Sequence, residues 1–323
     1  MFACLRTMAS ALRGAACVFA VGLGACAAAA APVTVTDAAG RSVTIADASR
    51  IVSIGGAVTE ILYALGRSER IVAVDTTSIY PPQALATHPN VGYQRQVSAE
   101  GVLGMRPSLV LAIEGTGPKE TVAVLESAAV PLVLVPDHFT GQGVVEKIRL
   151  IAQATGARKQ GECLAAAVTS QLDQLARLRD QVAAPARVLF VLSMAGDRLL
   201  VAGNGTAADG IIRLAGGVNA ITGYDGYKAV NDEAIVAAKP DAILVMSRGR
   251  QVLTADTVFA HPAFKMTPAA AQRRLIAFDG LYLLGFGPRT PAAAGDLARA
   301  LHPTLAQAGA GPSATSGVSE CGT

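Results

Sequence analysis

Short apolar runs alternate with amphipathic helical stretches along most of this chain. In the first half, the runs "RIVSIGG", "RIVAVD", "SLVLAIEG" and "PLVLVPD" are separated by helical patterns such as "TEILYALG" and "KETVAVLESAA". Strands that are apolar at consecutive positions are typical of sheets buried on both faces, and their alternation with helices indicates a parallel α/β sheet. We therefore predict an N-terminal α/β lobe over residues 32–157, beginning with a β-hairpin at Val33–Asp47.

A second α/β series follows a long helical segment. Residues 158–184 carry the longest uninterrupted helical pattern, and Pro185 ends it. The runs "RVLFVLS", "DAILVMS" and "RRLIAFDG" then alternate with helical stretches over residues 185–308. These patterns predict an α/β fold of two Rossmann-like lobes with mainly parallel sheets, joined by a single long α-helix, with a ligand cleft between the lobes. Residues 309–323 are rich in Gly, Ser and Thr and are expected to form a disordered tail.

The two halves of the chain resemble each other in sequence. Ser98–Leu111, "SAEGVLGMRPSLVL", aligns without a gap with Asn231–Leu244, "NDEAIVAAKPDAIL". Upstream, the Gly-Tyr pair ending in Tyr93 matches the pair ending in Tyr227, and "TEILYALG" matches "DGIIRLAG". Any two helix–proline–strand units look alike, but three matches in the same order favour an internal duplication. Because ligands of open α/β sheets bind beyond the carboxyl ends of the strands, both Gly-Tyr loops can border the cleft.

Residues 1–31 have the pattern of an export signal. Arg6 and Arg13 precede the apolar run Ala15–Gly24, which is short for a bilayer span, and small residues follow it. We therefore expect a secretory signal peptide and a periplasmic protein. The sequence "LGAC" also resembles a bacterial lipobox, which would make Cys26 a lipidated first residue. Soluble and lipid-anchored forms both fit this pattern.

Composition narrows the classes of function. The chain is 51% hydrophobic and 16% charged, its net charge of +3 is spread out, and it has no basic stripe, so nucleic-acid binding is not expected. It contains no phosphate-binding loop, no Gly-x-Ser-x-Gly elbow and no suitable Cys/His pair, so we expect a protein without enzymatic activity. Aromatic residues make up only 4% of the chain, which gives weight to each tyrosine in a polar loop.

Two cysteines lie in the mature part of the chain, Cys163 in the long helical segment and Cys321 in the tail. Two cysteines do not make a disulfide framework, and neither belongs to a Cys-x-x-Cys pattern. We expect a half-buried helix thiol and a separate tail thiol more than a bridge between them.

The most distinctive polar segment is "NVGYQRQVSAEG", which contains Tyr93 and Arg95. It belongs to a chain-wide similarity, from about Arg50 to Pro303, to bacterial periplasmic haem-binding proteins of ABC-type haem uptake, within the helix-linked class of substrate-binding proteins. The segments that carry this resemblance are "SIGGAVTEILYALG", "YPPQALATHPNVGYQRQVSAEGVLGMRPSLVLA", "VAGNGTAADGIIRLAGGVNA", "GYKAVNDEAIVAAKPDAILVMSRG" and "DGLYLLGFGPRTPAAAGDLARALHP". The Gly-Tyr-x-Arg-x-x-Ser-Ala-Glu-Gly block is the most specific of them.

The resemblance implies that Tyr93 is the axial ligand of a ferric haem. Phenolate is a known haem ligand, and ferric iron prefers anionic oxygen. A free phenol has a pKa of about 10, so a nearby cation would assist its ionisation. Arg95 is placed to do so if the segment is extended, because residues i and i+2 of a strand point the same way. The alternative is an exposed loop tyrosine beside a solvated arginine.

Other residues are expected at the cleft. Haem propionates need cationic partners, and the resemblance supports Arg248 in that role, with Lys228 of the second Gly-Tyr loop as another candidate. Tyr227 would stack on the porphyrin or line the cleft. Met194 stands where some similar proteins have a histidine, and it is either a packing residue or a second iron ligand. The identity of a sixth ligand and the binding of one or two haems stay open.

Glu100 and Glu233 occupy matched positions in the two halves. The resemblance implies that they dock on basic residues of an inner-membrane ABC permease, whereas their places in first helical turns also suit interaction with the helix dipole. The predicted protein is a monomer that captures haem as its transported ligand and delivers it to the permease and its ATPase. The alternative is the same scaffold binding a ferric siderophore or cobalamin. A siderophore site need not donate an iron ligand, so it would not require the Tyr93 phenolate.

Overall fold

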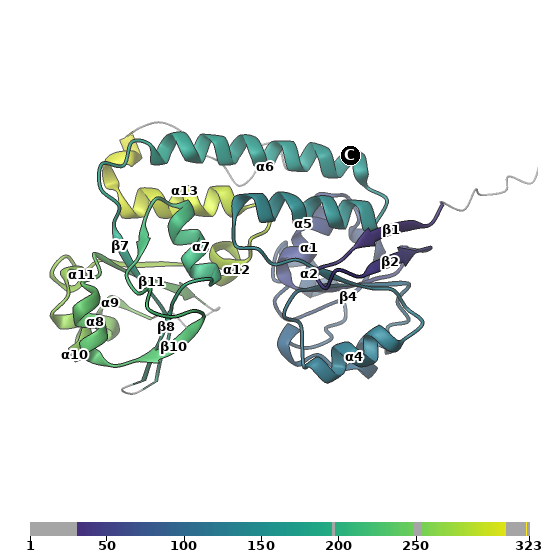
Figure 1. Cartoon of the computed structure of the whole chain (residues 1–323), viewed down its shortest axis with the longest axis horizontal. Helices are drawn as coiled ribbons and strands as arrows, with labels where there is room; N and C mark the ends of the chain where they lie inside the picture. The colour runs from purple at the N-terminus through teal and green to yellow at the C-terminus, as the bar shows by residue number, and fades with distance from the viewer. Residues whose placement is uncertain (1–30, 196–197, 248–252, 308–320, 322–323) are drawn as a thin grey trace, which may run out of the picture. The chain divides into compact units, whose positions relative to one another are not determined.

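The computed structural model describes residues 31–195, 198–247, 253–307 and 321 (Figure 1). The predicted signal peptide with Cys26, the candidate Arg248 and all of the predicted tail except Cys321 lie outside the described residues.

The first half of the chain contains a hairpin and a parallel sheet. The hairpin pairs β1 (Val33–Thr36) with β2 (Ser42–Ile45) in antiparallel fashion, as the alternating pattern predicts. The sheet has the order β4-β3-β5-β6, and all its pairs are parallel. Its strands are β3 (Ile51–Ile54), β4 (Ile71–Val74), β5 (Leu109–Ile113) and β6 (Leu132–Val135). Every residue of β3 and β5 is buried, which explains their uninterrupted apolar sequence.

The sheet of the second half is mixed. Its order is β10-β8-β7-β11-β12, with β9 paired to β7. The pairs β7–β11, β11–β12 and β7–β9 are parallel, whereas β8 is antiparallel to both β7 and β10. The strands are β7 (Arg187–Ala195), β8 (Arg198–Ala202), β9 (Val218–Asn219), β10 (Tyr227–Val230), β11 (Ala242–Ser247) and β12 (Leu275–Asp279). The predicted parallel arrangement therefore holds for the central strands, and the short β7–β8 connection adds an antiparallel edge.

Helices surround both sheets. Those of the first half are α1 (Gly56–Ala64), α2 (Pro82–Thr87), α3 (Ala99–Gly104), α4 (Lys119–Ser127) and α5 (Gly141–Ala154), with 3-10 turns at Ser68–Arg70 and Gln94–Gln96. Those of the second half are α7 (Ala207–Leu214), α8 (Asp232–Ala238), α9 (Ala255–Ala260), α10 (Pro262–Lys265), α11 (Pro268–Ala271), α12 (Gly280–Leu284) and α13 (Thr290–Leu301), followed by a 3-10 turn at Pro303–Gln307.

A single long helix, α6 (Arg158–Arg179), connects the two halves. It buries Leu164, Val168, Leu175 and Leu178, whose spacing of three to four residues or its multiples forms one apolar face. This face packs on α5 of the first half and on α13 of the second (Figure 1). The predicted long connecting helix is therefore present, and it ends at Arg179.

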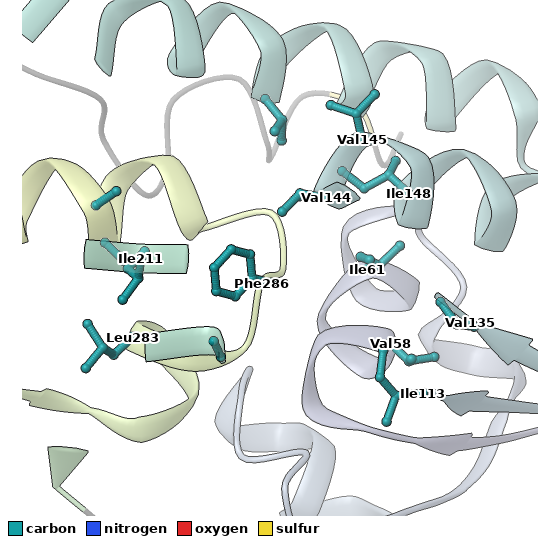
Figure 2. Close-up of a cluster of buried hydrophobic side chains, with 14 of the residues drawn as sticks. Val58, Ile61, Ile113, Val135, Val144, Val145, Ile148, Ile211, Leu283 and Phe286 are labelled. Carbon is teal, nitrogen blue, oxygen red and sulfur yellow. The ribbon is translucent and has the colours of Figure 1, made fainter. Parts of the chain in front are cut away.

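One hydrophobic core runs through both halves of the unit Pro32–Thr323. It joins Val144 and Ile148 of α5 to Ile211 of α7 and to Phe286, which follows α12 (Figure 2). Phe286 also lies edge-on to the ring of Phe139, with ring centroids 5.3 Å apart. The halves thus share buried apolar surface in addition to the connecting helix, which limits their independent motion.

The structure repeats the features that suggested a duplication. Helices α3 and α8 are capped at aligned positions, where Ser98 Oγ accepts from the Gly101 amide and Asn231 Oδ1 accepts from the Ala234 amide. Each helix is followed by a basic residue in the left-handed region, Arg106 with φ 49° and Lys239 with φ 44°. Left-handed backbone is uncommon for such residues, so its recurrence at aligned positions is stronger support for duplication than the sequence match alone.

Cys163 of α6 and Cys321 form a disulfide, so the expectation of two separate thiols is wrong. Their Cα atoms are 5.6 Å apart, within the usual range for a bridge. Cys321 is 5% exposed and packs against the main core, so the expectation of a wholly disordered tail is also wrong at this residue. The contact joins residues 158 positions apart, which a count of cysteines does not reveal.

Candidate functional site

A buried aspartate organises the loop after β4. Asp75 is fully buried, and its carboxylate accepts hydrogen bonds from the Gly55 amide at 2.9 Å, from the hydroxyl of Thr77 at 2.7 Å and from that of Ser78 at 2.8 Å. A carboxylate satisfied in this way fixes the loop at the carboxyl end of the sheet. The loop then presents Ile79 and Tyr80, which are 42% and 37% exposed.

The loop that carries Tyr93 is attached to the same edge. The Thr76 amide donates to the Gly92 carbonyl at 2.9 Å, and Asn90 forms a parallel bridge with Val74. Gly92 has φ +100°, a backbone conformation that residues with a Cβ rarely adopt. Tyr93 follows at 42% exposure, and its hydroxyl makes no hydrogen bond within the described residues. The structure therefore places an exposed, unengaged phenol on a loop that is hydrogen-bonded to the loop bearing Ile79 and Tyr80.

The predicted geometry of Arg95 is wrong. Residues Gln94–Gln96 form a 3-10 turn and not an extended segment, so the i, i+2 argument for pairing Arg95 with Tyr93 does not apply. Long-range hydrogen bonds impose the turn, because the Gly117 amide donates to the Gln94 carbonyl and the Val97 amide donates to the Gly117 carbonyl. The exposed Arg95 forms no salt bridge with any acid in the described part of the chain.

The structure brings Arg95 near Tyr227 of the second half. Burial raises the pKa of the Tyr227 hydroxyl, while its hydrogen bonds to the Ala208 backbone and Thr206, and the positive charge of Arg95, act in the opposite direction. The Tyr227 ring packs edge-on against Phe190, with centroids 6.3 Å apart. Tyr227 thus lines the region that faces Arg95, but its hydroxyl is already engaged at the start of α7.

Two other predicted site residues lie away from this region. Lys228 follows Tyr227 in β10, so its side chain points to the opposite face of the sheet, where its Nζ lies 5.1 Å from the ring centre of Tyr224. Met194 is half-buried and packs against the second apolar cluster, which also contacts Tyr224. The structure does not bring Lys228 together with Tyr227.

Sequence reasoning missed a bridge between the halves centred on Arg289, which directly precedes α13. Its guanidinium donates to Glu60 of α1 at 2.9 Å, and its backbone amide donates to the same carboxylate at 3.2 Å. The guanidinium carbon also lies 3.4 Å from the centre of the Tyr80 ring, a cation–π contact. Arg289 therefore holds one face of Tyr80 while that ring stays partly exposed. The segment "GFGPRTP" carried no sign of this role beyond one arginine at a helix start.

Glu100 and Glu233 are both exposed in the first turns of α3 and α8. The side-chain caps of these helices come from Ser98 and Asn231, so neither glutamate is needed as a cap. Within the described ranges, neither carboxylate forms an ion pair or a side-chain hydrogen bond. Both remain accessible to a partner.

No metal site and no membrane-spanning helix occur among the described residues. No group of three or more His, Cys, Asp or Glu side chains is arranged to hold a metal ion there. None of the helices in the described ranges combines the length and hydropathy needed to cross a bilayer.

Comparison with known proteins places this arrangement among binding proteins. The periplasmic heme-binding protein RhuT from Roseiflexus sp. RS-1, solved in apo form, is 42% identical, with a TM-score of 0.75 over 80% of this chain and 100% of that one. The periplasmic heme-binding protein BhuT, solved with two hemes, is also 42% identical, with a TM-score of 0.72 over 79% of this chain and 98% of that one. A cobalamin-binding protein of Halobacterium salinarum is 29% identical over 84% of this chain and 75% of its own length. Residues 51–281 match the model of the periplasmic binding protein family, and the chain belongs to that family.

Proposed function

We propose that this protein is a periplasmic substrate-binding protein that captures ferric haem and delivers it to an inner-membrane ABC importer. The observation that carries this proposal is the state of Tyr93, an exposed phenol without a hydrogen-bond partner among the described residues, on a loop fixed to the carboxyl edge of the sheet. Similarity to two heme-binding proteins, over 80% and 79% of this chain, supports the same ligand.

Tyr93 is better suited to bind iron than the tyrosines whose hydroxyls already form hydrogen bonds. The hydroxyls of Tyr224, Tyr227 and Tyr282 are engaged by the Val201 carbonyl, by the start of α7 and by Asp296 respectively. Burial and the Asp296 hydrogen bond also raise the pKa of Tyr282 above its ordinary value, which disfavours its phenolate. Tyr93 needs no existing bond to be broken before its oxygen coordinates a ferric ion.

The surroundings of Tyr93 suit a flat apolar ligand. Of the seven large hydrophobic side chains that are exposed in the described residues, Ile79, Tyr80 and Tyr93 belong to the two loops joined at Thr76. Such an apolar group beside charged side chains is typical of small-molecule sites. The guanidinium of Arg95, which forms no salt bridge within the described ranges, supplies a positive charge for a propionate or for the phenolate. Arg248 remains a proposed propionate partner by resemblance.

A second candidate ligand is cobalamin, because the Halobacterium salinarum relative is a cobalamin-binding protein. The two ligands are distinguished by titrating the protein with hemin and with cyanocobalamin in parallel and following absorbance. The proposal expects saturable binding of hemin and none of cyanocobalamin. Binding of cyanocobalamin alone would overturn it, and the end point of the hemin titration gives the stoichiometry.

Release to the importer would involve the two exposed glutamates. We propose that Glu100 and Glu233, exposed at matched positions, contact basic residues of the permease, and that the protein acts as a monomer in the periplasm. The Cys163–Cys321 disulfide supports an oxidising compartment. Cleavage of the signal peptide and lipidation of Cys26 are tested by the mass of the mature N-terminus.

A further inference from the structure

Each half of the chain carries a shallow apolar groove beside the helix that bears its exposed glutamate. In the first half, Leu103 of α3 and the residues Ala123 and Val124 of α4 line the groove. In the second half, Val236 and Ala237 of α8 and Ala263 of α10 line the corresponding groove. Most of the surface of both grooves is apolar. Neither groove belongs to the candidate haem site.

The two grooves are related by the duplication. Leu103 and Val236 occupy the same place, three residues after Glu100 and Glu233 respectively, in the gap-free alignment of the halves. In both halves a glutamate lies in the first turn of the helix that lines the groove, α3 or α8. A basic residue with left-handed backbone follows each helix. A chain therefore displays two similar surfaces, each combining an apolar depression with an accessible negative charge.

The apolar side chains in these grooves are unusually exposed. Val124 is 53% exposed and Val236 is 36% exposed, and they are two of the seven large hydrophobic side chains with such exposure in the part of the chain that the structure describes. Exposed apolar side chains gathered beside charges are typical of protein interaction surfaces. Two matched surfaces on one chain suit a partner that itself presents two equivalent surfaces, as a two-fold symmetric membrane dimer does.

We propose that these two grooves each seat an apolar side chain of the permease, adjacent to the basic residue that pairs with Glu100 or Glu233. This inference rests on the proposed function and adds an apolar anchor to the charge pairs. The charges orient the encounter, whereas burial of the anchors slows dissociation. An acidic substitution in a groove should then weaken docking without changing the haem site.

The test uses the full mature protein and the permease–ATPase complex reconstituted in lipid nanodiscs. Val124→Glu and Val236→Glu are compared with Val218→Glu, a control at a valine that is 37% exposed and outside both grooves. Biolayer interferometry should show that each groove variant binds the complex at least about tenfold more weakly, mainly through faster dissociation, while the control binds like the wild type. Hemin affinity should be the same for all four proteins.

Wild-type affinity for the complex in both groove variants would overturn the inference. The inference would also be overturned if the wild type dimerised in sedimentation velocity and both groove variants abolished the dimer, because a second copy of this chain would then occupy the grooves. Failure of the proposed function is distinguished by the hemin titration. A wild-type protein that does not bind hemin would be detected there, whatever the docking data show.

Discussion

The buried ion pair between Glu60 and Arg289 joins the two halves of the chain, and Glu60→Gln tests what it contributes. The side chains of Glu60 and Arg289 are only 7% and 13% exposed, and their charged atoms are 2.9 Å apart. The substitution keeps the shape of the side chain and an oxygen that accepts hydrogen bonds, but it leaves the guanidinium without a counter-charge.

The expected cost follows from this geometry. At 2.9 Å and an effective dielectric constant of about 20, the attraction between two unit charges is about 6 kcal/mol. Desolvation of both groups offsets part of this attraction, and breaking a buried pair typically costs about 3–5 kcal/mol. Because the retained amide oxygen and the Tyr80 ring still contact the guanidinium, we expect a loss of about 3 kcal/mol in the free energy of unfolding.

Urea unfolding followed by circular dichroism measures this loss, with a double-mutant cycle that adds Arg289→Met. The two single variants should each be destabilised, and the double variant should lose much less than their sum because no buried charge is left unpaired. Glu162→Gln is the control, since its pair with Arg149 is 3.0 Å long but 65% and 50% exposed, and should change stability by no more than about 1 kcal/mol. Additive losses below about 1 kcal/mol for the Glu60 and Arg289 variants would contradict a buried, coupled pair, because they would mean that the pair is solvated.

Three further predictions concern stability and the Tyr93 loop. Cys163→Ser should lower the free energy of unfolding by up to about 5 kcal/mol, which is the chain-entropy value for a loop of this length. Peptide mapping of the wild type should recover the two cysteine peptides joined by the disulfide. Unlinked peptides under oxidising conditions would contradict the disulfide. Burial lowers the pKa of His302 below the ordinary histidine value of about 6.5, so the unfolded chain takes up a proton first as the pH falls. Stability should therefore decrease below about pH 6.5, and His302→Gln should flatten this decrease in a series of urea titrations; an unchanged slope would count against it. Gly92→Ala should lower the free energy of unfolding by about 1–2 kcal/mol and weaken hemin binding, because Gly92 has a φ of +100°. Gly104→Ala is the control and should leave both properties unchanged, because Gly104 has helical backbone and open space for a Cβ. Equal behaviour of the two variants would exclude backbone strain as the cause.

The fold was largely predictable because it depends on patterns that are local in sequence. Consecutive apolar positions identified the buried strands β3 and β5, and the long amphipathic pattern identified α6. The aligned halves also predicted a repeated helix–proline–strand unit, which α3 and α8 now show down to their caps. The antiparallel pairing of β8 with β7 and β10 was not predicted, because the apolar run of a strand is similar whether a short connection or a crossover follows it.

The contacts around the candidate site could not be predicted from the sequence. The turn at Gln94–Gln96 is imposed by hydrogen bonds to Gly117, which lies beyond the next strand, so the local pattern around Arg95 suggested the wrong geometry. The Glu60–Arg289 pair joins residues 229 positions apart, and the disulfide joins residues 158 positions apart. Such pairings depend on how the two halves pack, for which the spacing of residue types contains no signal.

Coordination of ferric haem by the Tyr93 oxygen is tested by the absorption and resonance Raman spectra of the hemin complex. Tyr80→Phe is the matched control, because Tyr80 is also an exposed tyrosine and lies in the adjoining loop. The wild type and Tyr80→Phe should both show the phenolate-to-iron charge-transfer band and the tyrosinate vibrations, and Tyr93→Phe should lose both and bind hemin far more weakly. Persistence of these signals in Tyr93→Phe, or their absence in the wild type, would contradict the assignment.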